Sequence, residues 1–283
     1  MKKGLVLEGG AMRGMFTCGV IDVFMENDID FDGCIGVSAG AAFGCNIKSK
    51  QIGRPIRYNK RFCNDERYAS FSEWLKTGDL YNEDFCYDEM IHVYDIWDEE
   101  TFKNNPMEFY CVATDIEEGI PVYYKCKNGD DKDIRWIRAS ASMPFFSNPV
   151  EIDGHKYLDG GTTDSIPLRF MEANGYDKII VVETQPYHFI KTKQKYLPVI
   201  KHKLNDYPLL IHALENRHIM YNRQKEYVKT RESEKKVYVI RPENSLNIKS
   251  TCKDPNELER VYQIGRQTAL AHLSEIKEYL NTK

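Results

Sequence analysis

A serine framed by small residues at a strand-to-helix turn constrains this chain more than any other feature. Gly36 to Gly40 reads G-x-S-x-G, with the apolar stretch 34–37 leading into Ser38 and a run of small residues after it. At such a turn the serine takes a strained backbone conformation that only small neighbours permit, so its hydroxyl projects from the edge of a sheet. The pentapeptide predicts a nucleophilic Ser38 at an elbow formed with Gly36 and Gly40. Its other interpretation is a plain turn of small residues.

The segments around this turn predict the fold class. Residues 5–8 form a short apolar strand, and a helix follows the glycine-rich residues 9–14, because Phe16, Val20 and Phe24 recur at helical spacing. Strand, glycine turn, helix, strand, tight turn and helix then alternate, which predicts an α/β fold with three α/β/α layers and a mainly parallel central sheet. Further strands are expected at 108–114, 120–125, 150–152, 157–158, 179–183 and 236–241, and long helices at 206–231 and 255–280.

Length and composition bound the number of domains. The chain has 283 residues, 42% of them hydrophobic, which is enough for one sizeable core. With no internal repeat or linker, it is expected to form a single domain over 1–283. The core would span about 4–185, and a C-terminal extension of helices and strand would span about 186–283. Residues 53–105 are expected to form a helical excursion whose acidic cluster, 95–100, faces solvent.

Charge and cysteine content exclude several classes of protein. The chain has 39 basic and 43 acidic side chains, a formal net charge of −4, whereas a nucleic-acid binder normally shows a basic excess. No apolar run approaches the roughly 18 residues that span a bilayer, and Glu8 interrupts the first apolar stretch, so no signal sequence is expected. Eight scattered cysteines without a C-x-x-C pair predict reduced, buried thiols, no metal site and no cofactor. These features favour a cytoplasmic protein, either free or peripheral at the membrane.

The glycine-rich loop at 9–14 has two candidate uses. G-x-G-x-x-G after a first strand is typical of a dinucleotide site, but Ala11 replaces the second required glycine, and the next strand ends in Ser38 rather than in an acid. The alternative is an oxyanion hole, in which the amides of Gly9, Gly10 and Ala11 stabilise negative charge on a carbonyl oxygen. The sequence favours the oxyanion hole.

A nucleophilic serine needs a general base, and the sequence offers two kinds. Histidine is the usual base, but none of the seven histidines lies in a glycine-flanked turn after a late strand. His155 comes closest, and it reads better as part of a hairpin turn. Asp159 follows an apolar strand and precedes Gly160 and Gly161. Its carboxylate would therefore lie at the end of a strand, next to flexible backbone. A plain turn or a helix N-cap is the other interpretation of this acid.

The glycine loop, the GVSAG turn at 36–40 and the DGG turn at 159–161, in this order and spacing, resemble the patatin-like phospholipase family. The resemblance covers residues 4–185, and three more segments fit it, at 113–115, 139–144 and 164–167. It implies a modified α/β-hydrolase fold and a Ser–Asp dyad without histidine. Ser38 would then attack a lipid ester, and Asp159 would accept its proton.

The resemblance also implies roles around the dyad. A free aspartate, with a pKa near 3.9, is a poor base at neutral pH, so Asp159 would need a raised pKa both here and when it activates the water that releases the fatty acid. Arg13, beside Gly14, would brace the oxyanion loop by donating to its carbonyl oxygens; its alternative role is to bind a substrate phosphate. Ala11 departs from the family, which commonly has a third glycine there. The alanine leaves the amide in place, and its side chain narrows the side of the loop on which the acyl group would enter.

Residues 187–203 combine basic and apolar residues without an acid: Lys191, Lys193, Lys195, Lys201 and Lys203 alternate with Tyr187, Phe189, Tyr196, Leu197, Val199 and Ile200. One interpretation is a mobile cap that contacts an anionic membrane surface, where each lysine contributes about 1 kcal/mol. The other is a solvated loop over the sheet. The expected partner is a lipid or other acyl ester. Two further hypotheses remain open: a catalytically silent protein that binds acyl lipids on the same fold, and a Ser-His-Asp esterase that uses His155.

Overall fold

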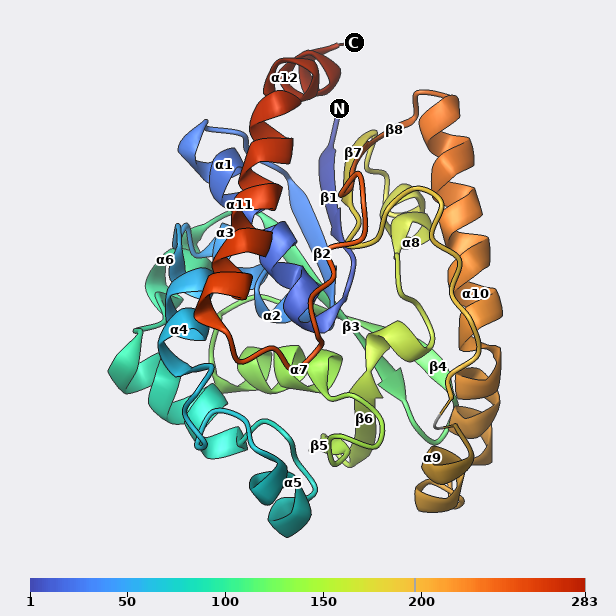
Figure 1. Cartoon of the computed structure of the whole chain (residues 1–283). Helices are drawn as coiled ribbons and strands as arrows, with labels where there is room; N and C mark the ends of the chain where they lie inside the picture. The colour runs from blue at the N-terminus through green and yellow to red at the C-terminus, as the bar shows by residue number, and fades with distance from the viewer. Residues whose placement is uncertain (196, 283) are drawn as a thin grey trace.

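One sheet organises the chain (Figure 1). Its strands are β1 (Lys3–Leu7), β2 (Gly33–Val37), β3 (Glu108–Asp115), β4 (Ile120–Cys126), β5 (Val150–Ile152), β6 (His155–Asp159), β7 (Lys178–Val182) and β8 (Val237–Ile240). The computed structural model describes residues 1–195 and 197–282, and in this part of the chain the strand order is β5-β6-β3-β2-β1-β7-β8, with β4 also paired to β3. Tyr196, one of the aromatic residues named above, lies outside the described residues, as does Lys283.

The two faces of the sheet are covered by different helices, which gives three layers (Figure 1). Leu5 and Leu7 of β1 pack on one side, in a cluster with α1 (Gly14–Glu26) and α11 (Pro255–Ala271). Val6 points to the opposite side, in a cluster with α8 (Leu168–Ala173) and α10 (Pro208–Ser233). Strands β3, β2, β1, β7 and β8 run parallel to their neighbours in this order. The predicted α/β/α fold with a mainly parallel central sheet is confirmed.

The position of β6 determines where Ser38 and Asp159 meet, because β2 and β6 pair with successive parts of the same edge of β3. Val37, the last residue of β2, pairs with Val112 of β3. The next residue of β3, Ala113, pairs with Asp159 at the end of antiparallel β6. Strand β4 occupies the opposite edge of β3 over both positions. The residue after β2 and the last residue of β6 therefore meet at one point of the sheet.

The remaining helices lie in the connections between the strands, except α12, which follows α11. They are α2 (Ala39–Ala42), α3 (Cys45–Lys48), α4 (Arg54–Phe62), α5 (Phe71–Thr77), the π-helical η2 (Phe85–Tyr94), α6 (Glu99–Asn104), α7 (Asp131–Ala141), α9 (Leu197–Lys203) and α12 (Leu273–Asn281), with the short 3-10 turns η1 (Ala11–Arg13) and η3 (Gly160–Thr162). Over 1–195 and 197–282, no helix has both the length and the apolar character needed to cross a membrane.

One helix is shorter than predicted. The last predicted helix is interrupted at His272, so α11 and α12 are separate helices. After Ser38, the short helices α2 and α3 follow each other, with Phe43 and Gly44 between them.

The acidic cluster at 95–100 is only partly solvated, so its prediction was wrong for two residues. Asp95 accepts two hydrogen bonds from Arg57, at 2.7 and 2.8 Å. Asp98 caps α6 by accepting the backbone N–H of Thr101 at 2.8 Å. Both carboxylates therefore hold the local structure, whereas Glu99 and Glu100 are exposed as expected.

Glycines let α1 and α11 approach each other closely. A Cβ on Gly265 of α11 would lie 2.0 Å from the carbonyl oxygen of Phe16, and a Cβ on Gly19 of α1 would lie 2.2 Å from that of Tyr262. Backbone atoms cannot move aside as the end of a flexible side chain can. The covering layer over the first face of the sheet therefore depends on these two positions.

We expect Gly265→Ala to lower the free energy of unfolding by about 1–3 kcal/mol, because the methyl group overpacks the contact with α1. This loss should exceed the gain of up to about 1 kcal/mol that alanine brings to a helix interior. Urea unfolding followed by circular dichroism measures the change. Gln267→Ala, at an exposed position of the same helix, should stay within about 0.5 kcal/mol of the wild type. A Gly265→Ala protein as stable as the wild type would contradict the close contact.

Candidate active site

Ser38 lies at the turn between β2 and α2 in a strained conformation. Its φ is 57° and its ψ is −124°, a left-handed combination that is costly for a residue with a side chain. A Cβ on Gly36 would lie 2.3 Å from the Gly40 carbonyl oxygen, and one on Gly40 would lie 2.3 Å from the carbonyl oxygen of Leu7. The N–H of Ser38 donates to Ser140 Oγ at 3.0 Å. Small residues on both sides and Ser140 of α7 thus hold the turn.

Asp159 contacts Ser38 directly. Its Oδ2 accepts the hydroxyl of Ser38 at 2.6 Å, and its Oδ1 accepts the N–H of Gly161 at 2.7 Å. The N–H of Asp159 donates to the carbonyl oxygen of Ser142 at 2.7 Å, in the same segment as Ser140. Since both carboxylate oxygens are engaged, the side chain is oriented toward the hydroxyl. Ser38 is only 9% exposed and Asp159 only 4%.

Two of the three further segments that resemble the family, 113–115 and 164–167, hold the DGG turn. Thr114 Oγ1 donates to the carbonyl oxygen of Asp159 at 2.9 Å, and Ser165 Oγ donates to that of Gly161 at 2.8 Å. A Cβ on Gly160 would lie 2.1 Å from the carbonyl oxygen of Val112, so the turn lies directly against β3. Residues 113–115 and 164–167 therefore position the carboxylate through its own backbone.

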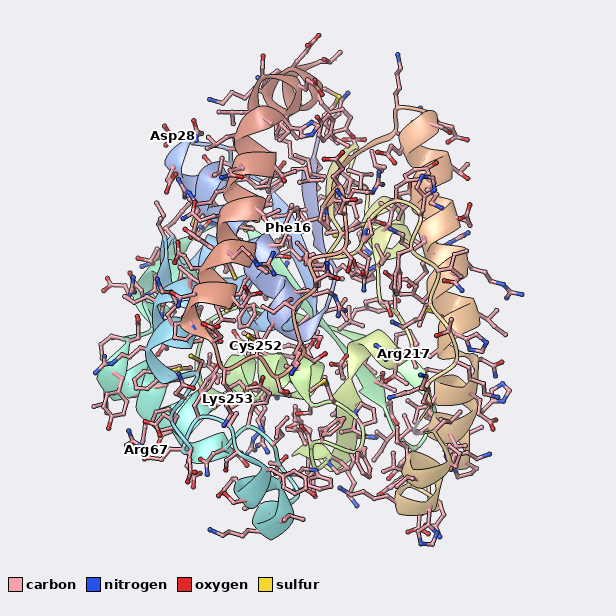
Figure 2. All side chains as sticks on the ribbon, in the orientation of Figure 1. Phe16, Asp28, Arg67, Arg217, Cys252 and Lys253 are labelled. Carbon is pink, nitrogen blue, oxygen red and sulfur yellow. The ribbon has the colours of Figure 1, made fainter. Side chains whose placement is uncertain are left out.

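Burial raises the pKa of Asp159, because removal from water disfavours a charged carboxylate. The nearby guanidinium of Arg217 and the hydrogen bond from Ser38 act in the opposite direction. Arg217 comes from α10, and its Nε donates to the carbonyl oxygen of Gly161 at 2.6 Å; Figure 2 shows it in the space between α10 and the end of the sheet. Sequence analysis did not identify Arg217, since one arginine in a highly charged helix carries no signal of what it contacts.

The glycine loop places free amides beside Ser38. Within the described chain, nothing accepts a hydrogen bond from the amides of Gly9, Gly10 or Ala11, and all three residues line the cavity that contains Ser38. A Cβ on Gly9 would lie 2.8 Å from that of Ser38, so the loop and the serine are in contact. Ala11 has a φ of 49°. Unpaired amides next to a hydroxyl can stabilise negative charge that develops on a bound carbonyl oxygen.

Arg13 does not brace this loop as predicted. In the described chain its Nε is buried without a hydrogen-bond partner. The loop carbonyl oxygens are already satisfied by backbone: Gly10 accepts the N–H of Arg13 at 3.1 Å, and Ala11 accepts that of Gly14. The guanidinium lines the cavity instead. Gly14 supports the loop by close packing, since a Cβ there would lie 2.9 Å from that of Ala39.

Two cavities meet at Ser38, and Ala11 and Met143 line both with it. The first has a volume of about 110 Å³. Its lining is mostly apolar and aromatic, and includes Met12, Phe43, Tyr58, Tyr81, Tyr87, Met90, Ile91, Ile134 and Ile137. The second has a volume of about 440 Å³ and is called the polar cavity below, because charged and polar side chains lie in its lining beside apolar ones. Its lining includes the dyad, the glycine loop, Arg13, Lys191 and Arg217.

Histidine is not part of this arrangement. Among the residues described, none of those lining the cavity with Ser38 and Asp159 is a histidine. His155 lies at the β5–β6 hairpin, as its sequence predicts, with its side chain 62% exposed and its Nδ1 3.9 Å from the carboxylate of Asp115. Across the same described residues, no three His, Cys, Asp or Glu side chains are grouped to hold a metal ion.

Comparison with known proteins gives two family matches. The model described as patatin-like phospholipase matches residues 5–171, and one described as a domain of unknown function (DUF6363) matches residues 207–281. The uncharacterized protein YjjU of Escherichia coli strain K12 is 26% identical over 289 residues, which cover 99% of this chain and 79% of that protein. Lysophospholipase NTE1 of Saccharomyces cerevisiae is 29% identical over 191 residues, which cover 64% of this chain and 10% of that protein. The chain therefore spans about a tenth of the yeast protein.

Among solved structures, the crystal structure of VipD from Legionella pneumophila aligns with 97% of this chain and 67% of its own. The sequence identity is 14% and the TM-score is 0.48.

The raised pKa of Asp159 predicts a stability effect with a definite sign. A carboxyl whose pKa rises on folding contributes stability at low pH, and that contribution is lost as the pH increases through the raised value. At pH 7 Asp159→Asn, which keeps the shape without the charge, should therefore increase the free energy of unfolding. The gain should vanish as the pH falls toward 3.8, the ordinary pKa. Urea unfolding at several pH values measures it.

Asp133 provides the matched control. It is also buried, but its carboxylate accepts the N–H groups of Asn128 and Gly129, each at 2.7 Å, and the hydroxyl of Tyr124 at 3.1 Å. Asp133→Asn should lower the free energy of unfolding by about 1.5–3 kcal/mol, the contribution of hydrogen bonds to a charged group. A loss of the same size in Asp159→Asn would show that the charge at 159 stabilises the fold, contrary to the prediction.

Proposed function

The chain belongs to the patatin-like phospholipase family, and from this premise we propose that it hydrolyses carboxylic esters of lipids with Ser38 as nucleophile and Asp159 as general base. One observation carries the proposal: the hydroxyl of Ser38 donates to Asp159 Oδ2 at 2.6 Å, inside a cavity. The description of the yeast relative as a lysophospholipase supports a lipid ester as substrate.

In the first half of the reaction, Ser38 Oγ attacks the ester carbonyl carbon while its proton moves to Asp159 Oδ2. The carbonyl oxygen becomes negatively charged and receives hydrogen bonds from the free amides of Gly9, Gly10 and Ala11. One such donor typically lowers the barrier by about 3 kcal/mol. Because aspartate is a weaker base than histidine, these amides account for a large share of the rate enhancement in this mechanism.

Burial of Asp159 suits both halves of the reaction. A raised pKa makes the carboxylate a stronger base toward Ser38. When the ester C–O bond breaks, protonated Asp159 returns its proton to the leaving alcohol oxygen, and an acyl-enzyme remains on Ser38. Asp159 then takes a proton from a water molecule, whose oxygen attacks the acyl carbon. The bond between the acyl carbon and Ser38 Oγ then breaks, and Asp159 returns the proton to Ser38 Oγ, which leaves a carboxylic acid and free Ser38.

The apolar cavity on one side of Ser38 supports a fatty acyl chain as the acyl group. It starts at the serine and extends among buried side chains of α2, α4, η2 and α7. Each methylene group moved there from water contributes about 0.8 kcal/mol. Arg54 lines it as well, but its guanidinium is satisfied by Asn46 Oδ1 and the carbonyl oxygen of Asp95, so it presents no free charge to the chain.

We place the activity in the cytoplasm, with residues 187–203 as a transient contact to the membrane surface. Ile190 and Val199 are 72% and 53% exposed, and Lys193 and Lys195 are exposed beside them. Exposed apolar and basic side chains in one segment favour binding to an anionic lipid interface. Residues 187–195 contain no helix or strand, and the following α9 packs against α10 through Leu197, Ile200, Leu210 and Leu214.

The decisive test is covalent labelling. A fluorophosphonate probe should label the wild type and fail to label Ser38→Ala, because Ser38 has a base and oxyanion donors beside it. Asp159→Asn should slow labelling and the hydrolysis of p-nitrophenyl hexanoate by about 10²–10⁴-fold, the usual contribution of a general base. Thermal unfolding of each variant checks that it is folded.

His155→Ala is the control that separates the alternatives. We expect it to label and to hydrolyse the ester at the wild-type rate. Loss of activity in this variant would establish a Ser-His-Asp esterase in place of the dyad. A folded wild type that never labels would establish a catalytically silent protein that binds acyl lipids.

The apolar cavity predicts chain-length selectivity. Ala42 lines it one turn of helix after Ser38, so the isobutyl group of Ala42→Leu should fill part of its volume. We expect kcat/KM for p-nitrophenyl octanoate to fall at least about tenfold relative to that for the acetate, since tenfold corresponds to about 1.4 kcal/mol, or two methylene groups. Ala271→Leu, at an exposed position, should leave the octanoate-to-acetate ratio unchanged. An unchanged ratio in Ala42→Leu would exclude this cavity as the acyl site.

A further inference from the structure

Two of the free amides of the glycine loop belong to peptide units that are held from their carbonyl side. An amide N–H and the preceding carbonyl oxygen lie on opposite sides of one planar trans unit, so a hydrogen bond to the oxygen also fixes the direction of the N–H. The unit that carries the Ala11 amide is held by backbone, since the Gly10 carbonyl oxygen accepts the N–H of Arg13 at 3.1 Å. The unit that carries the Gly10 amide is held by a side chain.

That side chain is Thr184, in the segment that follows β7. Its Oγ1 donates to the carbonyl oxygen of Gly9 at 3.1 Å. A Cβ on Gly10 would lie 2.6 Å from the same Oγ1, so the hydroxyl and the loop backbone are in close contact. The register of the sheet brings them together: Leu7 of β1 pairs with Val182 of parallel β7, and Gly9 and Thr184 each follow two residues later.

The peptide unit between Gly9 and Gly10 needs such a restraint. Glycine adopts positive and negative φ about equally readily, so a unit with a glycine on each side can turn over at little steric cost. Turning over would present the Gly9 carbonyl oxygen, instead of the Gly10 N–H, to the cavity that both residues line. An oxygen there would repel the negative charge that develops on the substrate. The hydroxyl of Thr184 opposes this rotation, and it polarises the unit so that the N–H becomes a stronger donor.

Glu8 holds Thr184 in this position. Its Oε2 accepts the backbone N–H of Thr184 at 2.6 Å and lies 3.3 Å from the Thr184 hydroxyl. Its Oε1 accepts the hydroxyl of Tyr221 at 2.6 Å. Glu8 and Tyr221 are each 2% exposed and Thr184 is 0% exposed, so water does not compete for these hydrogen bonds. The carboxylate therefore connects Tyr221 on α10 to the segment after β7.

Thr184 lies behind the loop rather than in the polar cavity. Gly9, Gly10, Glu8 and Tyr221 line that cavity, but among the residues that the structure describes Thr184 is not part of the lining. Its hydroxyl can therefore act on a bound ester only through the Gly9–Gly10 peptide unit.

We propose that Thr184 is a positioning residue of the oxyanion hole, and that Glu8 and Tyr221 hold it in place. The inference rests on the proposed hydrolysis at Ser38. Thr184 and Tyr221 lie outside residues 5–171, which the patatin-like model matches, and Tyr221 lies within residues 207–281, which match the domain of unknown function. One role of that C-terminal region is then to keep the Gly10 amide directed at the substrate oxygen.

Removal of the hydroxyl tests the proposal. Thr184→Val keeps the shape of the side chain but loses its donor. With p-nitrophenyl hexanoate, we expect kcat and kcat/KM to fall together by at least about tenfold, because the lost interaction acts on the transition state. Loss of an entire oxyanion donor costs about 10²–10³-fold. Thr184→Ser, which keeps the hydroxyl and loses a methyl group, should retain most of the wild-type rate.

The order of the two variants separates positioning from packing. If Thr184 only fills space, valine is tolerated and serine is the slower variant, and this order would overturn the proposal. Thr268→Val is the matched control, because it removes a hydroxyl that donates at 2.8 Å to the carbonyl oxygen of Ile264 within α11. It should keep the wild-type rate. Thermal unfolding checks that each variant is folded at the assay temperature.

A double-mutant cycle tests the connection through Glu8. Tyr221→Phe removes the hydroxyl that Glu8 accepts, and we expect it to lower kcat in the otherwise wild-type protein. In the Thr184→Val background the same change should have little further effect, because two residues that act through one network are not additive. Additive losses would overturn the connection and, with it, the role of the C-terminal region.

Amide NMR tests the position of the peptide unit without turnover. A hydrogen bond to a carbonyl oxygen polarises the amide that follows it, so Thr184→Val should move the Gly10 amide nitrogen resonance upfield by more than that of Ala11. Thr184→Ser should leave both near their wild-type positions. An unchanged Gly10 resonance in Thr184→Val would overturn the proposal. A wild type that shows the Gly10 shift on substitution but hydrolyses no ester would retain the restraint by Thr184 and refute only the proposed hydrolysis.

Discussion

The pairing of two strands with one edge of β3 is the constraint on which the candidate site depends. Strand β2 ends where Val37 faces Val112, and β6 takes over at the next residue, where Asp159 faces Ala113. Ser38 and Asp159 are 121 residues apart in the chain, yet this register brings their side chains to 2.6 Å. A shift of one residue would turn the carboxylate to the other face of the sheet. The sheet thus provides the precision that a flexible loop could not.

Burial links the stability of this site to its chemistry. The same removal from water that raises the pKa of Asp159 disfavours its charge at neutral pH. Ser38 adds backbone strain, since its φ is 57°. Such costs persist only where the surroundings fix the geometry, which Ser140, Ser142 and Thr114 do here through hydrogen bonds. Local instability of this kind is common at functional sites.

The features that could be predicted from the sequence are those that depend on residues close together along the chain. The strand order of the first fifty residues, the turn at Ser38 and the strand end at Asp159 follow from short patterns of apolar and small residues. Arg13 was misjudged, because whether the loop carbonyl oxygens need a donor depends on how the 3-10 turn satisfies them. Arg217 was not identified, because its contact with Gly161 requires α10 to pack across the second face of the sheet. Patterns within a helix carry no record of such long-range packing.

Different parts of the chain form the dyad and the outer lining of the cavity, and α10 belongs to the second part. Residues 5–171 contain the elbow, the glycine loop and the DGG turn, and these match the patatin-like family. The later segment, which includes β7, α9 and α10, closes the polar side of the cavity and contributes Lys191, Arg217 and Tyr221 to it. Arg217 connects the two parts, since it donates to the carbonyl oxygen of Gly161 in the DGG turn and lines the cavity that contains Ser38. A change in the later segment can therefore alter which ester is bound while the register of β2, β3 and β6 keeps the dyad in place.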